Sequence, residues 1–432
     1  MDSKSLARNL AQSLAMGPWS RQFIRATLVR RLPRQLHRMI AGLSEELIKS
    51  LPCAYAPSVK TVAGALGRSD RFEKILRHCI RHDVWPDPDL SSPAMAPVAA
   101  FATLDLPQLA TLDALAEWLF LPPDRLEYLA DKDSRYEEHR DAAVHHYHYI
   151  EKVKASGGVR IIEAPKPHLK AAQRRILRGI LDKVPVHADA FGFVSGRNCL
   201  NGANRHVGED VVVCFDLRNF FPSIGLAPIF GLFRCIGYPH EVARLLTGLC
   251  VTTTPMHVAN TLTTVDRQTY RRPHLPQGSP ASPALANLAA FPLDRRLSGL
   301  AKSLDTNYSR YADDLSFSGD RESVGALLRA VPGIVADEGF ELNQTKTRIM
   351  SATSRQMVTG IVVNDHLNID RREFDRLKAI IHACGRPGDT RLADPVFRSA
   401  LLGKIAWVEA VNSQRGQKLL TLLSLSITSR HA

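Results

Sequence analysis

The order of apolar and polar residues divides the chain into a helical first part and a mixed second part. Residues 1–85 have apolar positions at helical spacing among many basic residues, so this part is predicted to be helical. Residues 86–97, PDPDLSSPAMAP, contain four prolines and are predicted to form a linker or surface loop. Two short helices are expected within residues 106–131, separated by the break at Pro122-Pro123.

From Tyr147 onwards, the pattern changes to short strands mixed with helices. Residues 146–165 read as two strands on either side of a Gly157-Gly158 turn. Residues 169–181 have the spacing of a basic amphipathic helix, residues 211–217 form an apolar run typical of a buried strand, and residues 308–319 predict another strand pair. Strands and helices mixed in one block indicate an α+β fold.

The last part of the chain, residues 371–432, is predicted to be helical and basic. Apolar residues at helical spacing form two stripes, one with Phe374, Leu377, Ile381 and Cys384 and the other with Phe397, Leu401, Ile405 and Val408. This part has 11 Lys and Arg against 5 Asp and Glu. A basic helical face suits the phosphate backbone of RNA, although the outer face of any packed helical bundle is also charged.

Composition adds an expectation about partners and location. The 432 residues include 56 Lys and Arg and 43 Asp and Glu, a net charge of +13. This balance is typical of proteins with an anionic partner, nucleic acid first, but charge alone favours that interpretation no more than a merely basic protein. No apolar stretch has the length of a membrane span, and the first residues lack the apolar core of a secretion signal. The seven cysteines contain no Cys-x-x-Cys pair, which predicts reduced thiols in a cytoplasmic protein.

Three acidic residues carry the candidate chemistry. Asp216 closes the apolar run of residues 211–217, and Asp313 and Asp314 lie between the two strands predicted in residues 308–319. Carboxylates from neighbouring strands can hold two Mg²⁺ ions about 3.5–4 Å apart for in-line phosphoryl transfer. Because an Asp-Asp pair alone is also typical of surface turns, the wider sequence context decides between these interpretations.

Six sequence blocks in a fixed order resemble the reverse transcriptases of bacterial retrons, in particular the myxobacterial type. YADD at 311–314 resembles the polymerase signature, and FDLRNFFPSI at 215–224 resembles the motif with the first catalytic Asp. The other blocks are GGVRIIEAPKPHLKAAQRRIL at 157–177, AFGFVSGRN at 190–198, LPQGSPASPALANLA at 275–289 and EGFELNQTKTRIM at 338–350.

Two further segments resemble motifs of the retron enzymes within that family. Val358-Thr359-Gly360 resembles the retron VTG motif. GANRH at 202–206 lies where retron enzymes usually carry an Asn-Ala-x-x-His motif, and here Gly202 replaces the Asn while Ala203 and His206 match.

The resemblance implies a right-hand polymerase fold with fingers, palm and thumb, preceded by an N-terminal helical extension of unknown role. The expected boundaries are 1–100 for the extension, 101–140 for a helical lead-in, 141–210 for the fingers, 211–370 for the palm with fingers insertions, and 371–432 for the RNA-binding thumb.

The resemblance also implies residue roles. Asp216, Asp313 and Asp314 would be the catalytic metal ligands, for two Mg²⁺ ions or alternatively Mn²⁺. The residues implied in nucleotide binding are Arg160 at the triphosphate, Phe221 as the gate that selects dNTPs, Gln277 and Gly278 at the base pair, and Lys346 near the pyrophosphate. The thumb residues implied in RNA binding are Arg371, Arg372, Arg376 and Lys378. For Phe221 a place in the core, and for Lys346 a structural role, remain alternatives.

The implied function is RNA-directed DNA synthesis on a cognate structured non-coding RNA, primed from an internal guanosine 2′-OH to give branched RNA–DNA, in anti-phage defence. The implied partners are that RNA and its DNA product, dNTPs and an effector protein, with no membrane. Two alternatives stay open, a group II intron-like reverse transcriptase and an RNA-binding scaffold without turnover. The presence of all three aspartates favours an enzyme over the scaffold.

Overall fold

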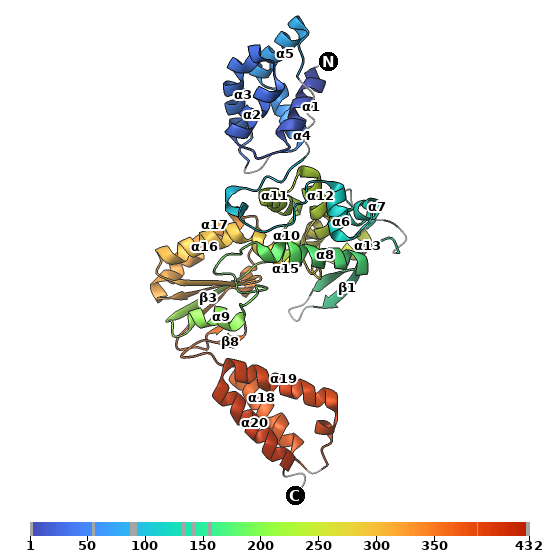
Figure 1. The fold of residues 1–432 in the computed structure, drawn as a ribbon. Coiled ribbons are helices and arrows are strands. Elements are labelled where there is room, and N and C mark those ends of the chain that lie inside the picture. Colours follow the sequence, from blue (N-terminus) through green and yellow to red (C-terminus); the bar gives the residue numbers. More distant parts are fainter. Residues whose placement is uncertain are drawn as a thin grey trace. The chain divides into compact units, whose positions relative to one another are not determined.

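The computed structural model describes residues 3–53, 57–86, 93–131, 135–137, 139, 143–153, 158–386 and 388–428 (Figure 1). Half of the predicted linker (residues 87–92) and Gly157 of the predicted turn lie outside these residues. The chain forms two compact units. The first comprises Met1–Pro185 and Phe221–Ala289, and the second comprises Val186–Phe220 and Ala290–Ala432.

The start of the first unit is helical, as the apolar spacing predicted. Its buried residues, among them Leu10, Leu28, Leu43 and Phe72, form a hydrophobic core drawn from this part of the chain alone. Serine side chains cap the N-termini of three of the helices, which stabilises their first turns. The elements are α1 (Ser3–Leu14), α2 (Arg21–Arg31), η1 (Arg34–Leu36), α3 (His37–Ser50), α4 (Val59–Gly67) and α5 (Asp70–His82).

The rest of the first unit combines one strand pair with helices. Strands β1 (Tyr147–Val153) and β2 (Val159–Pro165) are antiparallel, with Lys152 opposite Arg160. The predicted strand pair and the helix after it are confirmed, whereas the first helix expected within 106–131 begins only at Leu112. The remaining elements are η2 (Ala99–Phe101), α6 (Leu112–Leu119), α7 (Pro123–Ala130), α8 (Pro167–Gly179), η3 (Leu181–Lys183), α10 (Phe220–Ser223), α11 (Leu226–Ile236), α12 (His240–Cys250), α13 (Met256–Ala259), α14 (Thr264–Tyr270) and α15 (Ser282–Ala289).

The second unit is built around a four-stranded antiparallel sheet in the order β4-β5-β3-β6. Strand β3 is buried along its whole length, which explains its unbroken apolar sequence. Figure 1 shows α16 and α17 along one face of this sheet and α9 on the other side. The elements are α9 (Cys199–Ala203), η4 (Asn204–His206), β3 (Val211–Asp216), α16 (Phe291–Ser303), β4 (Asn307–Tyr311), β5 (Asp314–Gly319), η5 (Arg321–Ser323), α17 (Val324–Asp337), η6 (Gln344–Lys346), β6 (Arg348–Ser351), β7 (Met357–Val358) and β8 (Ile361–Val362).

Three longer helices complete the second unit, α18 (Arg371–Cys384), α19 (Pro395–Val411) and α20 (Ser413–Thr428), with η7 (Arg391–Ala393) between the first two. The predicted stripes pack inwards, since Leu377, Ile381, Leu401 and Ile405 are buried in one core cluster. Helix α20 packs against both α18 and α19.

Two expectations from composition, on the cysteines and on membrane spans, can be compared with the structure. All seven cysteines are free thiols, four of them buried. Among the described residues, none of the helices combines the length and hydropathy that a membrane-spanning segment requires.

Candidate active site

Two of the predicted catalytic carboxylates lie opposite each other at the ends of paired strands. Asp216 is the last residue of β3 and is the register partner of Asp314, the first residue of β5. Asp313 precedes Asp314 in the turn, and its carbonyl accepts a hydrogen bond of 2.8 Å from the Leu217 nitrogen. Because directly opposed residues on antiparallel strands are immediate neighbours, the fold brings all three acids to one edge of the sheet.

The turn that carries Asp313 has a left-handed backbone. Tyr311 and Asp314 are register partners, so Ala312 and Asp313 form a two-residue hairpin turn. Ala312 has a φ of +56°, as such turns require. A Cβ atom on Gly192 would lie 2.7 Å from the Ala312 nitrogen. The glycine in AFGFVSGRN therefore lets that segment pass close against the turn, a role that the sequence alone did not assign.

A buried ion pair supports the same turn. The Arg310 guanidinium donates to both carboxylate oxygens of Asp294 on α16, each at 2.7 Å, and to the Ala312 carbonyl at 3.1 Å. The Tyr308 hydroxyl donates to Asp294 at 2.9 Å. Burial by itself would lower the pKa of Arg310, but the Asp294 carboxylate outweighs it and raises that pKa. Sequence reasoning missed this pair, whose only signal was a charged residue inside an otherwise buried strand.

The segment after α17 contacts Asp216 through two residues. The Asn343 nitrogen donates to the Asp216 carbonyl at 2.8 Å, and the Lys346 ammonium donates to Asp216 Oδ1 at 2.7 Å. In the part of the chain that the structure describes, no three Asp, Glu, His or Cys side chains converge as a ready ion site. Since Lys346 pairs with Asp216, a cation that binds this carboxylate must compete with the ammonium group.

The electrostatics at this edge fit divalent cations. Burial, together with the negative charges of Asp313 and Asp216, raises the pKa of Asp314 from 3.8 to about 6, while Arg348 and Lys346 act in the opposite sense. Burial is the largest of these causes, and the two neighbouring carboxylates add repulsion that Arg348 and Lys346 do not fully offset. Carboxylate oxygens with excess negative charge are the donor set that Mg²⁺ prefers, so Asp216, Asp313 and Asp314 fit one or two such ions.

The four other residues predicted to bind nucleotide all belong to the first unit. Arg160 is exposed on β2. The Gln277 carbonyl accepts a hydrogen bond of 2.9 Å from the nitrogen of Glu163, which lies further along the same strand. A Cβ atom on Gly278 would lie 2.7 Å from the Glu163 carbonyl, and its φ is +145°, so glycine is required for this close approach. Phe221 starts the segment at which the chain returns to the first unit, and it is partly buried.

A buried polar network holds the Gln277-Gly278 loop against β2. The Glu163 carboxylate, fully buried, accepts from Thr254 at 2.6 Å and contacts His274 Nε2 at 3.0 Å. Burial would lower the pKa of His274, but the charge of Glu163 and the hydrogen bonds raise it above its usual value. Sequence reasoning did not single out Glu163 or His274, because their partners are far away in the chain.

A second polar network involves the motif at 202–206. His206 is fully buried between the hydroxyls of Ser318 and Ser309, with both contacts at 2.7 Å. It thereby links η4 to both strands of the hairpin that carries Asp313. A Cβ atom on Gly202 would lie 3.2 Å from the Phe191 ring, so a larger residue there requires the ring to shift.

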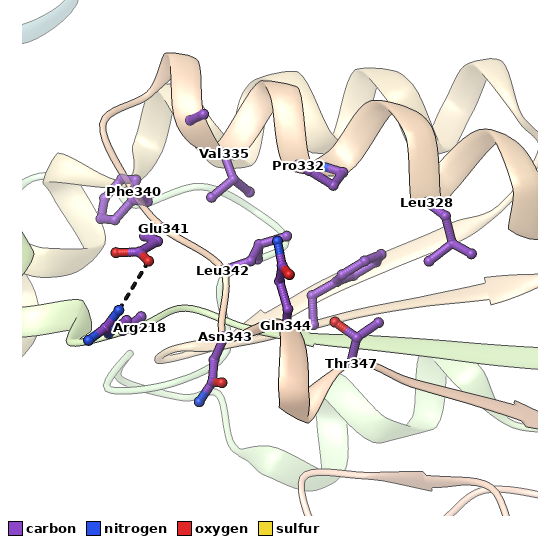
Figure 2. Close-up of a pocket in the computed structure, with 12 residues that line it drawn as sticks. Arg218, Leu328, Pro332, Val335, Phe340, Glu341, Leu342, Asn343, Gln344 and Thr347 are labelled. Atoms are coloured by element: carbon purple, nitrogen blue, oxygen red, sulfur yellow. Dashed lines mark hydrogen bonds and ion pairs between the residues drawn. The ribbon is translucent and has the colours of Figure 1, made fainter.

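A groove of about 840 Å³ lies between α17 and residues 340–347 (Figure 2). Val335, Pro332 and Leu328 line its α17 side, and the Arg218–Glu341 ion pair, 3.2 Å long, lies at one end. The segment 340–347 therefore lines this groove and also contacts Asp216 through Lys346.

The four predicted RNA-binding residues lie on the first three turns of α18 and differ in their partners. Asp375 forms an ion pair with Lys378 at 2.7 Å and a longer one with Arg371 at 3.7 Å. Arg372 and Arg376 are exposed and have no ion pair with a residue that the structure describes.

Comparison with known proteins gives one family match and several relatives. Residues 150–375 match the family model described as reverse transcriptase (RNA-dependent DNA polymerase). The retron Mx65 and Mx162 reverse transcriptases of Myxococcus xanthus are 40% and 35% identical, over 64% and 74% of this chain and 64% and 67% of their own lengths. The retron Ec86 reverse transcriptase of Escherichia coli is 32% identical over 64% of this chain and 79% of its own.

The similarity to solved structures is weak. A foamy viral protease–reverse transcriptase bound to double-stranded DNA is 17% identical, and the likeness covers 66% of this chain and 44% of that one with a TM-score of 0.32. The sequence relatives therefore carry the assignment, although the match to the Mx65 enzyme spans somewhat less than two thirds of its length.

Proposed function

The chain belongs to the family of reverse transcriptases (RNA-dependent DNA polymerases), and to its retron members, and from this premise we propose that it copies part of a cognate structured non-coding RNA into single-stranded DNA. The family has the right-hand polymerase fold, which agrees with the mixed α/β architecture. The observation that carries the proposal is the register of Asp216 with Asp314, with Asp313 in the adjoining turn.

In this proposal Asp216, Asp313 and Asp314 hold two Mg²⁺ ions, with Mn²⁺ as the alternative. Such ions supply an activated 3′-oxygen and stabilise the leaving pyrophosphate. Lys346, which contacts Asp216 at 2.7 Å, is placed to exchange that contact for an incoming anionic group. The Arg310–Asp294 pair holds the turn so that the carboxylate of Asp313 stays at the sheet edge.

The nucleotide is proposed to bind through residues of the first unit. Arg160 supplies positive charge for the triphosphate, and the Gln277-Gly278 backbone, fixed by Glu163, lies against the base pair. Phe221 selects dNTPs by excluding a ribose 2′-OH. The fingers (141–210), palm (211–370) and thumb (371–432) are proposed with the predicted boundaries, although residues of the predicted palm contribute to both compact units.

The finer proposal concerns priming, partners and location. DNA synthesis starts from an internal guanosine 2′-OH of the RNA, which leaves branched RNA–DNA, and the complex acts in anti-phage defence with an effector protein. The support is the similarity to enzymes named as retron reverse transcriptases. A cytoplasmic location is part of the proposal, and the seven free thiols support it.

The experiment expresses the protein with its native flanking DNA, as wild type and as the Asp313→Asn/Asp314→Asn variant, and analyses the nucleic acid that copurifies. We expect a discrete DNA with the wild type only, shortened by RNase and by a debranching enzyme. DNA that the debranching enzyme leaves intact would still support DNA polymerase activity but would contradict priming from a 2′-OH. RNA without DNA in both preparations would favour a binding scaffold.

A further inference from the structure

Most of the chain's net positive charge lies in its first 86 residues, which form the N-terminal helices. Residues 1–86 contain 15 Lys and Arg and 6 Asp and Glu, a balance of +9 out of +13 for the whole chain. Residues 87–370, which hold the candidate active site, contain 30 and 32, a balance of −2. The excess positive charge therefore lies outside the catalytic part, and more of it precedes that part than follows it.

One segment of these helices has no acidic residue at all. From Ser3 to Ser44 there is neither Asp nor Glu, whereas eight Lys and Arg occur. Arg25 on α2, Arg34 on η1 and Arg38 on α3 are exposed and form no ion pair with a residue that the structure describes. This segment thus presents charge to solvent without compensation.

Helix α5 presents a second set of basic residues. Lys74, Arg77 and Arg81 are exposed and spaced three and four residues apart, which places them on one side of the helix. Phe72, Ile75 and Cys79 are buried on the opposite side. The side of α5 that faces away from the core therefore carries Lys74, Arg77 and Arg81, of which Arg77 is paired with Glu73.

These basic residues are not needed to hold the helices together. The core of α1–α5 consists of apolar side chains from this part of the chain. Glu45, Glu46 and Glu73 already form ion pairs with Arg21, Arg71 and Arg77. The remaining like charges repel one another and lower the stability of the folded bundle, so their presence points to an anionic partner.

The side chains around the exposed basic residues indicate the class of the partner. A protein interface usually has an apolar centre. Among the described residues of α1–α5, the exposed large apolar side chains are only Val29 and Ile80. Dispersed cations without an apolar centre suit a phosphate backbone, which carries regularly spaced negative charge.

We propose that helices α1–α5 form a second RNA-binding module, whose exposed basic residues bind the phosphate backbone of the structured RNA that the enzyme copies. The identity of this RNA rests on the proposed function, whereas backbone binding does not. The module supplies sequence-independent affinity, and the catalytic part and the helices α18–α20 supply positioning on the template.

The test measures binding of the full-length protein to a blunt RNA duplex of arbitrary sequence by fluorescence anisotropy, over a series of salt concentrations. The test variant is Arg25→Gln/Arg34→Gln/Arg38→Gln. The matched control is Arg295→Gln/Lys302→Gln/Arg329→Gln, which removes the same charge from exposed positions on α16 and α17. We expect the slope of log K against log salt to become shallower by about 2 to 3 in the test variant and to stay near the wild-type value in the control.

Further arms separate this proposal from folding defects and from the proposed function. The charge-retaining variant Arg25→Lys/Arg34→Lys/Arg38→Lys should keep the wild-type slope. Extension of a short primed template at saturating concentration should persist in the test variant, whereas Asp313→Asn should abolish extension and keep the salt slope. Equal slopes in wild type and test variant, or equal losses in test and control variants, would overturn the proposal, and an acidic protein partner would then account for the charge.

Discussion

Asp216 lies directly opposite Asp314 in the antiparallel register of β3 and β5, and this pairing sets the charge of the candidate active site. Burial, followed by repulsion from the carboxylates of Asp313 and Asp216 at this sheet edge, raises the pKa of Asp314 to about 6. The Lys346 ammonium at Asp216 offsets part of the repulsion. The fold therefore carries an electrostatic cost where divalent cations are proposed to bind.

The first prediction concerns that cost. Because the folded-state pKa of Asp314 lies above its unfolded value of 3.8, its contribution to stability is fully present below pH 3.8 and is lost as the pH rises through about 6. Asp314→Asn removes the charge, so at neutral pH and with EDTA it should melt at a higher temperature than the wild type. It should also lose nucleotide addition.

The control for this variant is Asp320→Asn, which removes an exposed aspartate just beyond the end of β5. Its melting temperature should match that of the wild type. Added MgCl₂ should stabilise the wild type and the control but not Asp314→Asn. Identical melting of all three proteins with EDTA, at every pH, would show that the pKa of Asp314 is not raised in the folded protein.

A second prediction concerns selection of the sugar. If Phe221 excludes the ribose 2′-OH, Phe221→Ala should raise ribonucleotide incorporation relative to deoxyribonucleotide incorporation by roughly 10- to 200-fold, the discrimination that a one-group difference in substrate size gives in an apolar pocket. The measurement is single-nucleotide extension with each substrate. Phe220→Leu is the comparison, because Phe220 is buried and stacks on Phe340. Unchanged discrimination between ribonucleotides and deoxyribonucleotides in Phe221→Ala would indicate that Phe221 serves only in packing.

Much of the fold could be predicted from the sequence because apolar spacing is a local signal. The buried strand ending at Asp216, the hairpin around Asp313 and the stripes of α18 and α19 all follow from such patterns. The order of YADD and its companion blocks also predicted the family, which the match over residues 150–375 confirms.

The supporting contacts could not be predicted, because they join residues far apart in the chain. Glu163 and His274 are 111 residues apart, and His206 lies 103 and 112 residues from its two serines. Nothing in the local pattern around a buried His or Glu indicates which distant side chain will satisfy it. Tertiary packing alone decides these pairs. The sequence therefore indicated the acidic residues of the candidate site but not the contacts that support them.

The third prediction distinguishes the basic residues of α18. Lys378 and Arg371 share Asp375 as a partner, whereas Arg372 and Arg376 have no ion pair with a described residue. Arg372→Gln/Arg376→Gln should therefore weaken binding to structured RNA, and flatten its salt dependence, more than Arg371→Gln/Lys378→Gln does. The two double variants are matched controls for each other in charge and helix position. Equal effects of the two double variants would show that the ion pairs with Asp375 do not weaken the contacts of Arg371 and Lys378 with RNA. No effect of either variant would show that α18 is not part of the RNA-binding surface.

The last prediction concerns His206, which links η4 to both strands of the hairpin that carries Asp313. Burial, with the nearby charge of Arg205, lowers the pKa of His206 from 6.5 to about 3. Its contribution to stability is therefore present above pH 6.5 and is lost as the pH falls towards 3, because the unfolded state then binds the proton. His206→Gln cannot titrate, so its unfolding free energy should be lower at neutral pH but should fall less steeply with acid.

Denaturant unfolding at a series of pH values measures this difference, with His366→Gln as the control at an exposed position. Loss of the two serine contacts should reduce stability at neutral pH by about 1–3 kcal/mol. Because the hydrogen bonds hold both Ser309 of β4 and Ser318 of β5, their loss should also loosen the turn with Asp313 and slow primer extension. Parallel pH curves for the wild type and His206→Gln would mean that the imidazole binds its proton at the same pH in the folded and unfolded states, and the proposed frame around the hairpin would then be wrong.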